Sequence, residues 1–229
     1  MNIEYIDTLE ESKLLSPISR NKLSKLASES TLKNLNRGNY LFTDGQKLES
    51  MYLIVKGRIK LVKYAANGKE TILGVYGVGD TIGEMAAIDN RPATHSAVVM
   101  EPSTVYQIGL PAFRNLLRAD PGLSLRLAAA FGQRLREAES RISGLASDRV
   151  DQRIAGLLLK LSRDQGNGKP AGVISLPYRR QDIADIVGTS VETCIRVLSA
   201  FERSGAIEKI SRTRLRLDLA KLQAVSDLH

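Results

Sequence analysis

Basic residues begin and end one stretch of the chain, residues 179–216, at positions suited to binding phosphate. They are Arg179 and Arg180 at its start and Lys209, Arg212, Arg214 and Arg216 near its end. A guanidinium group is a permanent cation that can donate two parallel hydrogen bonds to phosphate oxygens. The last part of the stretch, GAIEKISRTRLRLDL, has the alternation of a β-hairpin. These residues therefore predict contacts with the backbone of a polyanion such as DNA.

The elements that must position these residues are two short helices joined by a tight turn, predicted for RQDIADIVGTSVETCIRVLSAFERSG (180–205). Gly188 supplies a residue that tolerates the positive φ of a sharp helix exit, and Ser190 is a natural N-cap. In the second helix, an inward apolar stripe is formed by Cys194, Val197, Leu198 and Phe201. The opposite face carries Val191, Glu192, Ile195 and Arg196. Plain helical hairpins share this spacing, but the basic flanks favour a winged helix-turn-helix whose second helix enters a major groove.

Composition agrees with two globular domains and a polyanionic partner. The chain has 229 residues, 43% of them hydrophobic, and a formal net charge of +8. The alternative is a merely soluble basic protein. A single cysteine, Cys194, excludes an intramolecular disulfide and an all-cysteine iron–sulfur cluster. No apolar run is long enough for a membrane span and MNIEYIDTLEES lacks the features of a signal peptide, so we expect a cytoplasmic protein without membrane contact.

Periodicity divides the chain into three parts and predicts an α+β fold. Residues 1–120 contain short alternating strands separated by turn residues, of which Asn67-Gly68 is the clearest hairpin signal, and predict an antiparallel β-roll. Residues 121–149 form a long helix and a hinge in the polar run SDRVD (147–151). Residues 150–229 form the winged helix-turn-helix domain.

The long helix, predicted from Gly122 to about Ser147, carries an apolar seam that calls for a partner helix. Its members recur at spacings of three and four and are Leu127, Phe131, Leu135, Ala138, Ile142 and Leu145. A helix of this length extends for about 39 Å, which is too long to be covered by one small barrel. We therefore expect a homodimer, which would place two recognition helices about one DNA turn apart on a pseudo-palindromic site. The alternative is a helix lying across its own barrel.

The order of these parts is similar to that of the CRP/FNR family of bacterial transcription regulators, typified by the cyclic-AMP receptor protein and the fumarate and nitrate reduction regulator. The resemblance rests on VKGRIKLVKY, GDTIGEMA with the following Ser96-Ala97 pair, the long helix, and RQDIADIVGTSVETCIRVL with its ETxxR pattern. It covers essentially the whole chain. It implies a homodimeric regulator that binds double-stranded DNA and works with RNA polymerase, and no enzyme.

The same resemblance assigns the effector to the segment GEMAAIDNRPATHSA (83–97) and to the long helix. His95 stands where cyclic-nucleotide-binding relatives have a phosphate-binding arginine, and Ala138 and Glu139 stand where they place a Thr-Ser pair against adenine. A largely neutral imidazole cannot replace arginine at a phosphate. We therefore expect an effector other than cyclic AMP. The expected effector set is Gly83, Glu84, Met85, Arg91, His95, Ser96, Ala97, Ala138 and Ile142.

Several cofactor hypotheses remain open at this point. The iron–sulfur branch of the family needs cysteines near the N-terminus, and this chain has none there. Haem remains possible, with His95 as an axial ligand and Met85 or Met100 as the nearest soft ligands, and so does another small metabolite. Cys194 is expected to be a small core residue, with a redox switch as the alternative. No nucleophile–histidine pair, metal-ligand cluster or phosphate loop predicts an enzyme.

In the family, a glutamate and an arginine of the recognition helix contact bases, and here they are Glu192 and Arg196. Arg196 would donate to guanine O6 and N7, and Glu192 would accept from a cytosine amino group. Val191 and Ile195 present methyl groups that suit thymine, so we predict half-sites with a TGA-like core. The expected DNA-binding set is Arg179, Arg180, Gln181, Ser190, Val191, Glu192, Thr193, Ile195, Arg196, Arg212 and Arg214.

Overall fold

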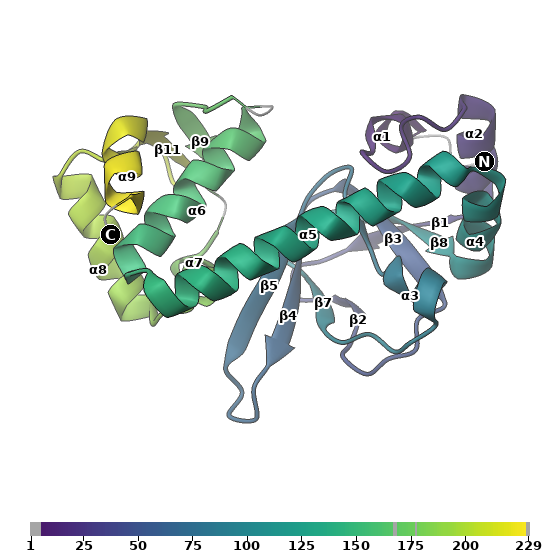
Figure 1. Ribbon diagram of the computed structural model, residues 1–229, viewed down its shortest axis with the longest axis horizontal. Helices are drawn as coiled ribbons and strands as arrows, with labels where there is room; N and C mark the ends of the chain where they lie inside the picture. The colour runs from purple at the N-terminus through teal and green to yellow at the C-terminus, as the bar shows by residue number, and fades with distance from the viewer. Residues whose placement is uncertain (1–5, 167–168, 177, 228–229) are drawn as a thin grey trace. The chain divides into compact units, whose positions relative to one another are not determined.

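The computed structural model describes residues 6–166, 169–176 and 178–227 of the chain (Figure 1). The chain divides into two compact units, which we call the roll unit (Met1–Arg136) and the HTH unit (Glu137–His229). The division falls inside the long helix α5 (Pro121–Ser147), so each end of this helix belongs to a different unit. The predicted division after residues 120 and 149 stays a prediction.

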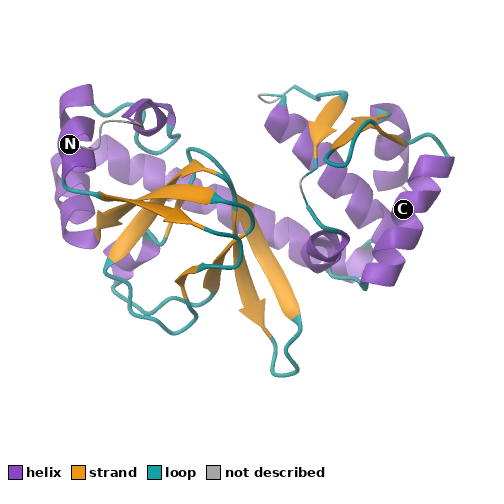
Figure 2. Ribbon diagram, turned by 180° about the vertical axis from the view of Figure 1, so that it is seen from behind, coloured by secondary structure: helices purple, strands orange, loops and turns teal. Residues whose placement is uncertain are grey.

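The roll unit is built on two four-stranded sheets whose strand pairs are all antiparallel (Figure 2). One sheet has the order β1-β8-β3-β6 and the other β2-β7-β4-β5. The strands are β1 (Thr31–Leu35), β2 (Tyr40–Phe42), β3 (Ser50–Lys56), β4 (Ile59–Tyr64), β5 (Glu70–Tyr76), β6 (Thr81–Ile82), β7 (Ser96–Val99) and β8 (Ser103–Gly109). The antiparallel roll predicted from the turn spacing is confirmed.

Local turn chemistry explains the clearest hairpin of the roll. Between β4 and β5, Gly68 adopts a φ of +79°, and the Asn67 side chain accepts a hydrogen bond from the Lys69 amide at 3.0 Å. A residue with a side chain is strained at this φ, and glycine is not. The Asn67-Gly68 signal therefore predicted the turn correctly.

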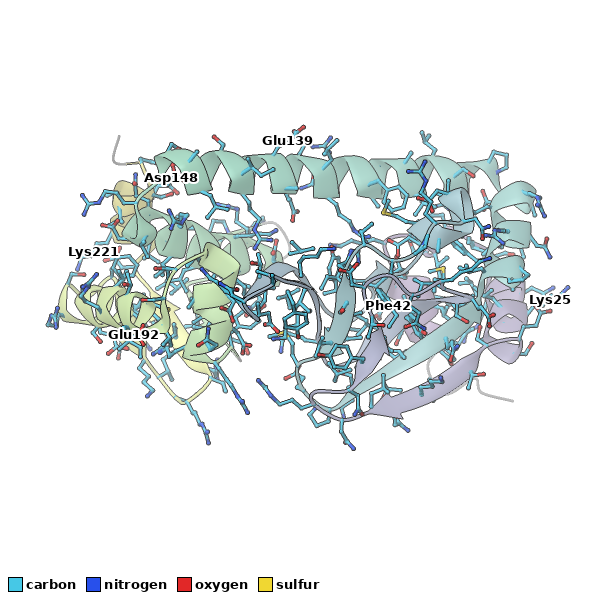
Figure 3. The ribbon with its side chains drawn as sticks, turned by 90° about the horizontal axis from the view of Figure 1, so that it is seen from below. Lys25, Phe42, Glu139, Asp148, Glu192 and Lys221 are labelled. Atoms are coloured by element: carbon cyan, nitrogen blue, oxygen red, sulfur yellow. The ribbon has the colours of Figure 1, made fainter. Side chains whose placement is uncertain are left out.

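Helices close the ends of the roll and contribute to its core. They are α1 (Ile6–Glu11), α2 (Arg20–Ser28), α3 (Met85–Asp89), α4 (Leu110–Ala119) and the first part of α5. Phe42 lies in the interior of the roll (Figure 3) and is 2% exposed. Leu123 and Leu127 of α5 belong to the same buried cluster, and Phe131 packs against it. Burial of this face therefore attaches the first half of α5 to the roll.

The HTH unit packs helices against a small three-stranded antiparallel sheet of order β10-β11-β9 (Figure 1). Its elements after α5 are α6 (Val150–Gln165), β9 (Val173–Ser175), α7 (Arg180–Val187), α8 (Val191–Arg203), β10 (Ile207–Lys209), β11 (Arg214–Leu217) and α9 (Leu219–Ser226). The hairpin β10–β11, which we call the wing, is present as predicted. Strand β9, which pairs with β11, was not predicted from the sequence.

The break between α5 and α6 falls within the predicted hinge. α5 ends at Ser147 and α6 begins at Val150, so Asp148 and Arg149 are the only residues between them. Among the described residues, no helix combines the length and the apolar character needed to cross a membrane.

Candidate DNA interface and effector site

The turn between α7 and α8 has the geometry that its residue types predict. Gly188 ends α7 in the left-handed conformation, with φ +70° and ψ +50°, and its N–H and that of Thr189 both donate to the Ala184 carbonyl. Ser190 then caps α8, its Oγ accepting a hydrogen bond from the Thr193 amide at 3.2 Å. The two helices therefore form the helix-turn-helix predicted from Gly188 and Ser190.

One face of α8 is buried and the other is exposed and polar. Cys194, Leu198 and Phe201 face the core, and burial raises the pKa of the Cys194 thiol above its usual value. Glu192, labelled on α8 in Figure 3, lies with Arg196 on the exposed face. Within the described part of the chain, neither of these two side chains has a hydrogen bond or an ion pair. A carboxylate and a guanidinium are thus available to an external partner.

The other predicted DNA-binding residues are exposed or half-buried around this face, and their side chains differ in how they are engaged. Arg180 lies 4.0 Å from Glu202, and the Gln181 amide donates to Asp185 at 2.9 Å. Arg212 and Arg214 of the wing are exposed, and their side chains have no partner among the described residues. The remaining members of the set lie at the N-terminal ends or on the outer faces of α7 and α8, and they are Arg179, Ser190, Val191, Thr193 and Ile195. The structure thus gathers the predicted set on one unit.

Glu84, which precedes α3, is the most deeply buried acidic side chain among the described residues of the roll, with 1% of its surface exposed. Arg134 of α5 donates one hydrogen bond to Glu84 Oε1 and another to the Thr81 carbonyl at 2.7 Å. The second carboxylate oxygen, Oε2, is buried without a hydrogen-bond partner. Burial raises the pKa of Glu84, and the nearby Arg134 charge opposes this shift. An unpartnered buried acceptor of this kind suits a ligand that brings a hydrogen-bond donor.

Arg134 is the site residue that the sequence analysis missed. Its guanidinium carbon lies 4.9 Å from the ring centroid of Tyr76 and 6.0 Å from that of Phe131. A signal was present, because Arg134 follows Leu127 by seven residues and so lies on the same face of α5, which turns toward the roll. The contact with Glu84 spans 50 residues of sequence and could not be seen in a local pattern.

The remaining predicted effector residues of the roll lie before β7 or within it. His95 Nδ1 is 3.2 Å from Thr94 Oγ1, and its ring packs on Phe42 with centroids 5.8 Å apart. Burial, with smaller contributions from the Lys63 and Arg134 charges, lowers the pKa of His95, and Asp44 opposes this. The imidazole is therefore neutral near pH 7.

The other predicted effector residues are either built into the fold of the roll or exposed. Ser96 Oγ accepts a hydrogen bond from the Asp44 amide at 3.0 Å, and Ala97 is buried in the core. Gly83 has a φ of +82°, which explains why glycine precedes Glu84. Met85 and Arg91 are exposed, Met85 by 55%. Effector residues Ala138 and Ile142 are exposed on the part of α5 that belongs to the HTH unit, so their part in the site stays a prediction.

The apolar seam of α5 divides between two faces. Leu135, Ile142 and Leu145 are 60%, 69% and 55% exposed, and Ala138 is exposed beside them. Leu127, which we had placed in the same seam, is 2% exposed and fills the core of the roll. If the exposed Ala128 is counted in the seam in place of Leu127, the spacings between successive members alternate between three and four residues, which is typical of a coiled coil. We call Ala128, Phe131, Leu135, Ala138, Ile142 and Leu145 the dimer seam, and their role in dimerisation stays a prediction.

Among the described residues, no group of three or more histidine, cysteine, aspartate or glutamate side chains could hold a metal ion.

Comparison with known proteins now identifies the family. The chain matches the cyclic nucleotide-binding domain over residues 32–120 and the Crp-like helix-turn-helix domain over residues 152–225. The cyclic AMP receptor protein of Thermus thermophilus is 32% identical over 171 residues, which cover 75% of this chain and 76% of that protein. The chain belongs to the CRP/FNR family of transcription regulators. The predicted resemblance is thereby confirmed, together with the α+β fold and the role in DNA-dependent regulation.

Further relatives agree with this assignment. The cAMP-activated global transcriptional regulator CRP of Escherichia coli O6:H1 is 31% identical over 174 residues, which cover 76% of this regulator and 83% of the relative. Among solved structures, FixK2 from Bradyrhizobium japonicum superposes with a TM-score of 0.77 at 22% identity, covering 87% of this regulator and 98% of that chain. A CooA mutant from Carboxydothermus hydrogenoformans gives a TM-score of 0.75 at 24% identity, covering 89% and 90%. The last two similarities establish the fold.

Proposed function

We propose that the regulator reads its DNA site with Glu192 and Arg196 of α8. The observation that carries this proposal is that both side chains are exposed on the helix-turn-helix and have no partner among the described residues. Arg196 donates to guanine O6 and N7, Glu192 accepts from a cytosine amino group, and the methyl groups of Val191 and Ile195 contact thymine. The half-site has a TGA-like core.

Phosphate contacts and dimerisation complete this proposal. The DNA phosphates are bound by Arg179, Arg180, Arg212 and Arg214. Polar contacts beside them come from Gln181, Ser190 and Thr193. Two copies associate through the exposed dimer seam of α5 and bind a pseudo-palindromic site. The regulator acts in the cytoplasm, contacts RNA polymerase, does not associate with a membrane and catalyses no reaction of its own.

A selection experiment tests the base contacts. Wild-type protein is used to select duplexes from a randomised pool, and Glu192→Ala and Arg196→Gln are then measured on the selected duplex and on versions changed at the core G·C pair. Each variant is expected to lose about 1–3 kcal/mol of discrimination at that pair. Glu202→Ala, an exposed glutamate nearer the other end of α8, is the matched control. Unchanged discrimination in both α8 variants contradicts the proposal.

We further propose that the roll binds a small effector at Glu84, with Glu84 Oε2 accepting a hydrogen bond from it and Arg134 holding the carboxylate in place. The other proposed effector residues of the roll are Gly83, Met85, Arg91, His95, Ser96 and Ala97. The proposed set also includes Ala138 and Ile142 of α5. Binding biases the arrangement of the dimer and of its DNA-binding units, with a coupling of about 1–3 kcal/mol. His95 in place of an arginine argues for an effector other than cyclic AMP.

A cyclic nucleotide is the second candidate for two reasons. Glu84, which is paired with Arg134, stands at the position that holds such ligands in the family. In addition, relatives about a third identical carry cyclic AMP in their names. Calorimetric titration of the regulator with cyclic AMP and cyclic GMP distinguishes a cyclic-nucleotide effector from a different metabolite. Absence of binding to the wild type supports a different metabolite. Binding that is lost in Glu84→Gln would instead make the regulator a cyclic-nucleotide sensor.

Haem is the third candidate, since the neutral imidazole of His95 has the protonation state that iron requires. An absorption spectrum of protein purified from cells supplied with iron and haem precursor decides whether the regulator binds haem. A Soret band that disappears in His95→Ala would identify a haem sensor.

A further inference from the structure

Four consecutive carbonyl groups at the end of α7 need partners that α7 itself does not supply. The last carbonyls of a helix have no intrahelical donor, and the negative end of the helix dipole lies among them. Within the turn, the Ala184 carbonyl accepts from the Gly188 and Thr189 amides. The last turn of α7 contains no basic residue, and it adds a buried carboxylate, Asp185.

Two arginines from other helices donate to the last two of these carbonyls. Arg141 of α5 donates from Nη2 to the Ile186 carbonyl at 2.9 Å. Arg153 of α6 donates from Nε to the Val187 carbonyl at 2.8 Å, and its Nη2 lies 3.5 Å from the Gly188 carbonyl. All of these residues belong to the HTH unit. Cations at a helix C-terminus are favourable, and hydrogen bonds from charged donors are stronger than neutral ones.

The same two helices also hold the turn by packing and by a further hydrogen bond. A Cβ on Gly188 would lie 2.7 Å from Leu145 Cδ2, so the end of α5 lies directly against the turn. Arg153 also donates from Nη1 to the Asp148 carbonyl, in the break between α5 and α6. One guanidinium thus joins the break before α6 to the end of α7.

We propose that Arg141 and Arg153 are positioning residues for DNA recognition, which act by capping α7 and so fixing the turn from which α8 starts. Neither side chain needs to contact DNA. The inference rests on the proposed use of α8 as the recognition helix, because Ser190 and Glu192 follow the capped turn within a few residues. It also explains why arginine stands at positions 141 and 153, whose charges the DNA-binding set does not use.

The first measurement is hydrogen exchange of the full-length protein, followed at the amides of Gly188 and Thr189. Arg141→Gln and Arg153→Gln are expected to accelerate exchange at these amides about 10-fold, with little change in the roll. Arg136→Gln on α5 and Arg163→Gln on α6 are the matched controls, since each removes the same charge from the same helix at an exposed position. Equal exchange in variants and controls overturns the capping role.

The second measurement separates positioning from direct contact with DNA. On the duplex selected by the wild-type protein, Arg141→Gln and Arg153→Gln are expected to weaken binding about 5- to 20-fold, with less than about a 2-fold change on a scrambled duplex. The slope of log affinity against log salt should stay unchanged, whereas a phosphate contact such as Arg212 lowers it by about 0.9 when replaced by glutamine. Arg141→Lys should recover part of the affinity, because an ammonium can still donate to the Ile186 carbonyl.

The outcomes distinguish this inference from the proposed function. A reduced salt slope in Arg141→Gln or Arg153→Gln would make these residues phosphate contacts and overturn the inference. So would an equal loss on both duplexes, which indicates general unfolding, or unchanged binding to the selected duplex. If Glu192→Ala keeps full discrimination, the recognition role of α8 fails instead.

Discussion

Replacing Arg134 by methionine should destabilise the roll in a manner that depends on pH. Glu84 is 1% exposed and Arg134 is the cation that donates to it. Removing one member of a buried ion pair leaves an uncompensated buried charge and costs about 3–5 kcal/mol of the free energy of unfolding. Because the Arg134 side chain is 31% exposed, water screens part of the interaction, and we expect about 3 kcal/mol near neutral pH.

The pH dependence follows from the raised pKa of Glu84. A carboxyl group whose pKa is higher in the folded state contributes stability that is complete below its ordinary pKa and is lost as the pH rises through the folded value. Arg134 opposes the effect of burial, so its removal raises the pKa of Glu84 further. The stability deficit of Arg134→Met should therefore be largest near pH 7 and shrink at acidic pH, once the carboxyl group has taken up a proton.

The stability deficit is measured by urea unfolding followed by far-ultraviolet circular dichroism, since the chain has no tryptophan to report by fluorescence. Arg136→Met, an exposed position on the same helix, is the control and should change stability by less than about 0.5 kcal/mol. The double variant Glu84→Gln/Arg134→Met should recover much of the loss, because no buried charge remains. A deficit that is below about 1 kcal/mol, or that stays constant between neutral and acidic pH, would refute the assigned ion pair.

Three further predictions concern single positions. Gly188→Ala should destabilise the HTH unit by about 1–2 kcal/mol in thermal unfolding, because alanine is strained at φ +70° and its Cβ meets Leu145, whereas Gly172→Ala, with no atom near its Cβ, should not. Ile142→Glu should convert the dimer to a monomer in sedimentation experiments, since it places a charge in the exposed seam, and a variant that remains dimeric contradicts that seam. Cys194 should react with iodoacetamide only after unfolding, because it is buried and its thiol pKa is raised; rapid modification of the native protein would revive the redox-switch hypothesis.

Much of the helix-turn-helix was predictable because its signals are local. Gly188 and Ser190 determine the end of one helix and the start of the next through their own backbone preferences, and the stripe from Cys194 to Phe201 follows from helical spacing alone. Asn67-Gly68 predicted a hairpin for the same reason. Such preferences act within a few residues and do not depend on the rest of the fold.

The placement of α5 residues was less predictable, because two apolar faces overlap in its sequence. Leu127 and Phe131 fit one helical stripe by spacing, yet Leu127 fills the core of the roll and Leu135 is exposed. Hydrophobicity shows that a residue will be buried and does not show against what. Only the packing of α5 on the roll distinguished the core face from the dimer seam.

The amino-acid sequence by itself determined the class of this protein: a β-roll, a long helix and a winged helix-turn-helix, in the order of the CRP/FNR family. The tertiary structure alone decided which distant side chains meet, bringing Arg134 to Glu84 and Arg141 and Arg153 to the end of α7. The physical reason is that turns, caps and amphipathic periods are set by neighbours along the chain. Buried charges and helix ends, in contrast, are satisfied by whichever donor the fold brings within hydrogen-bond distance.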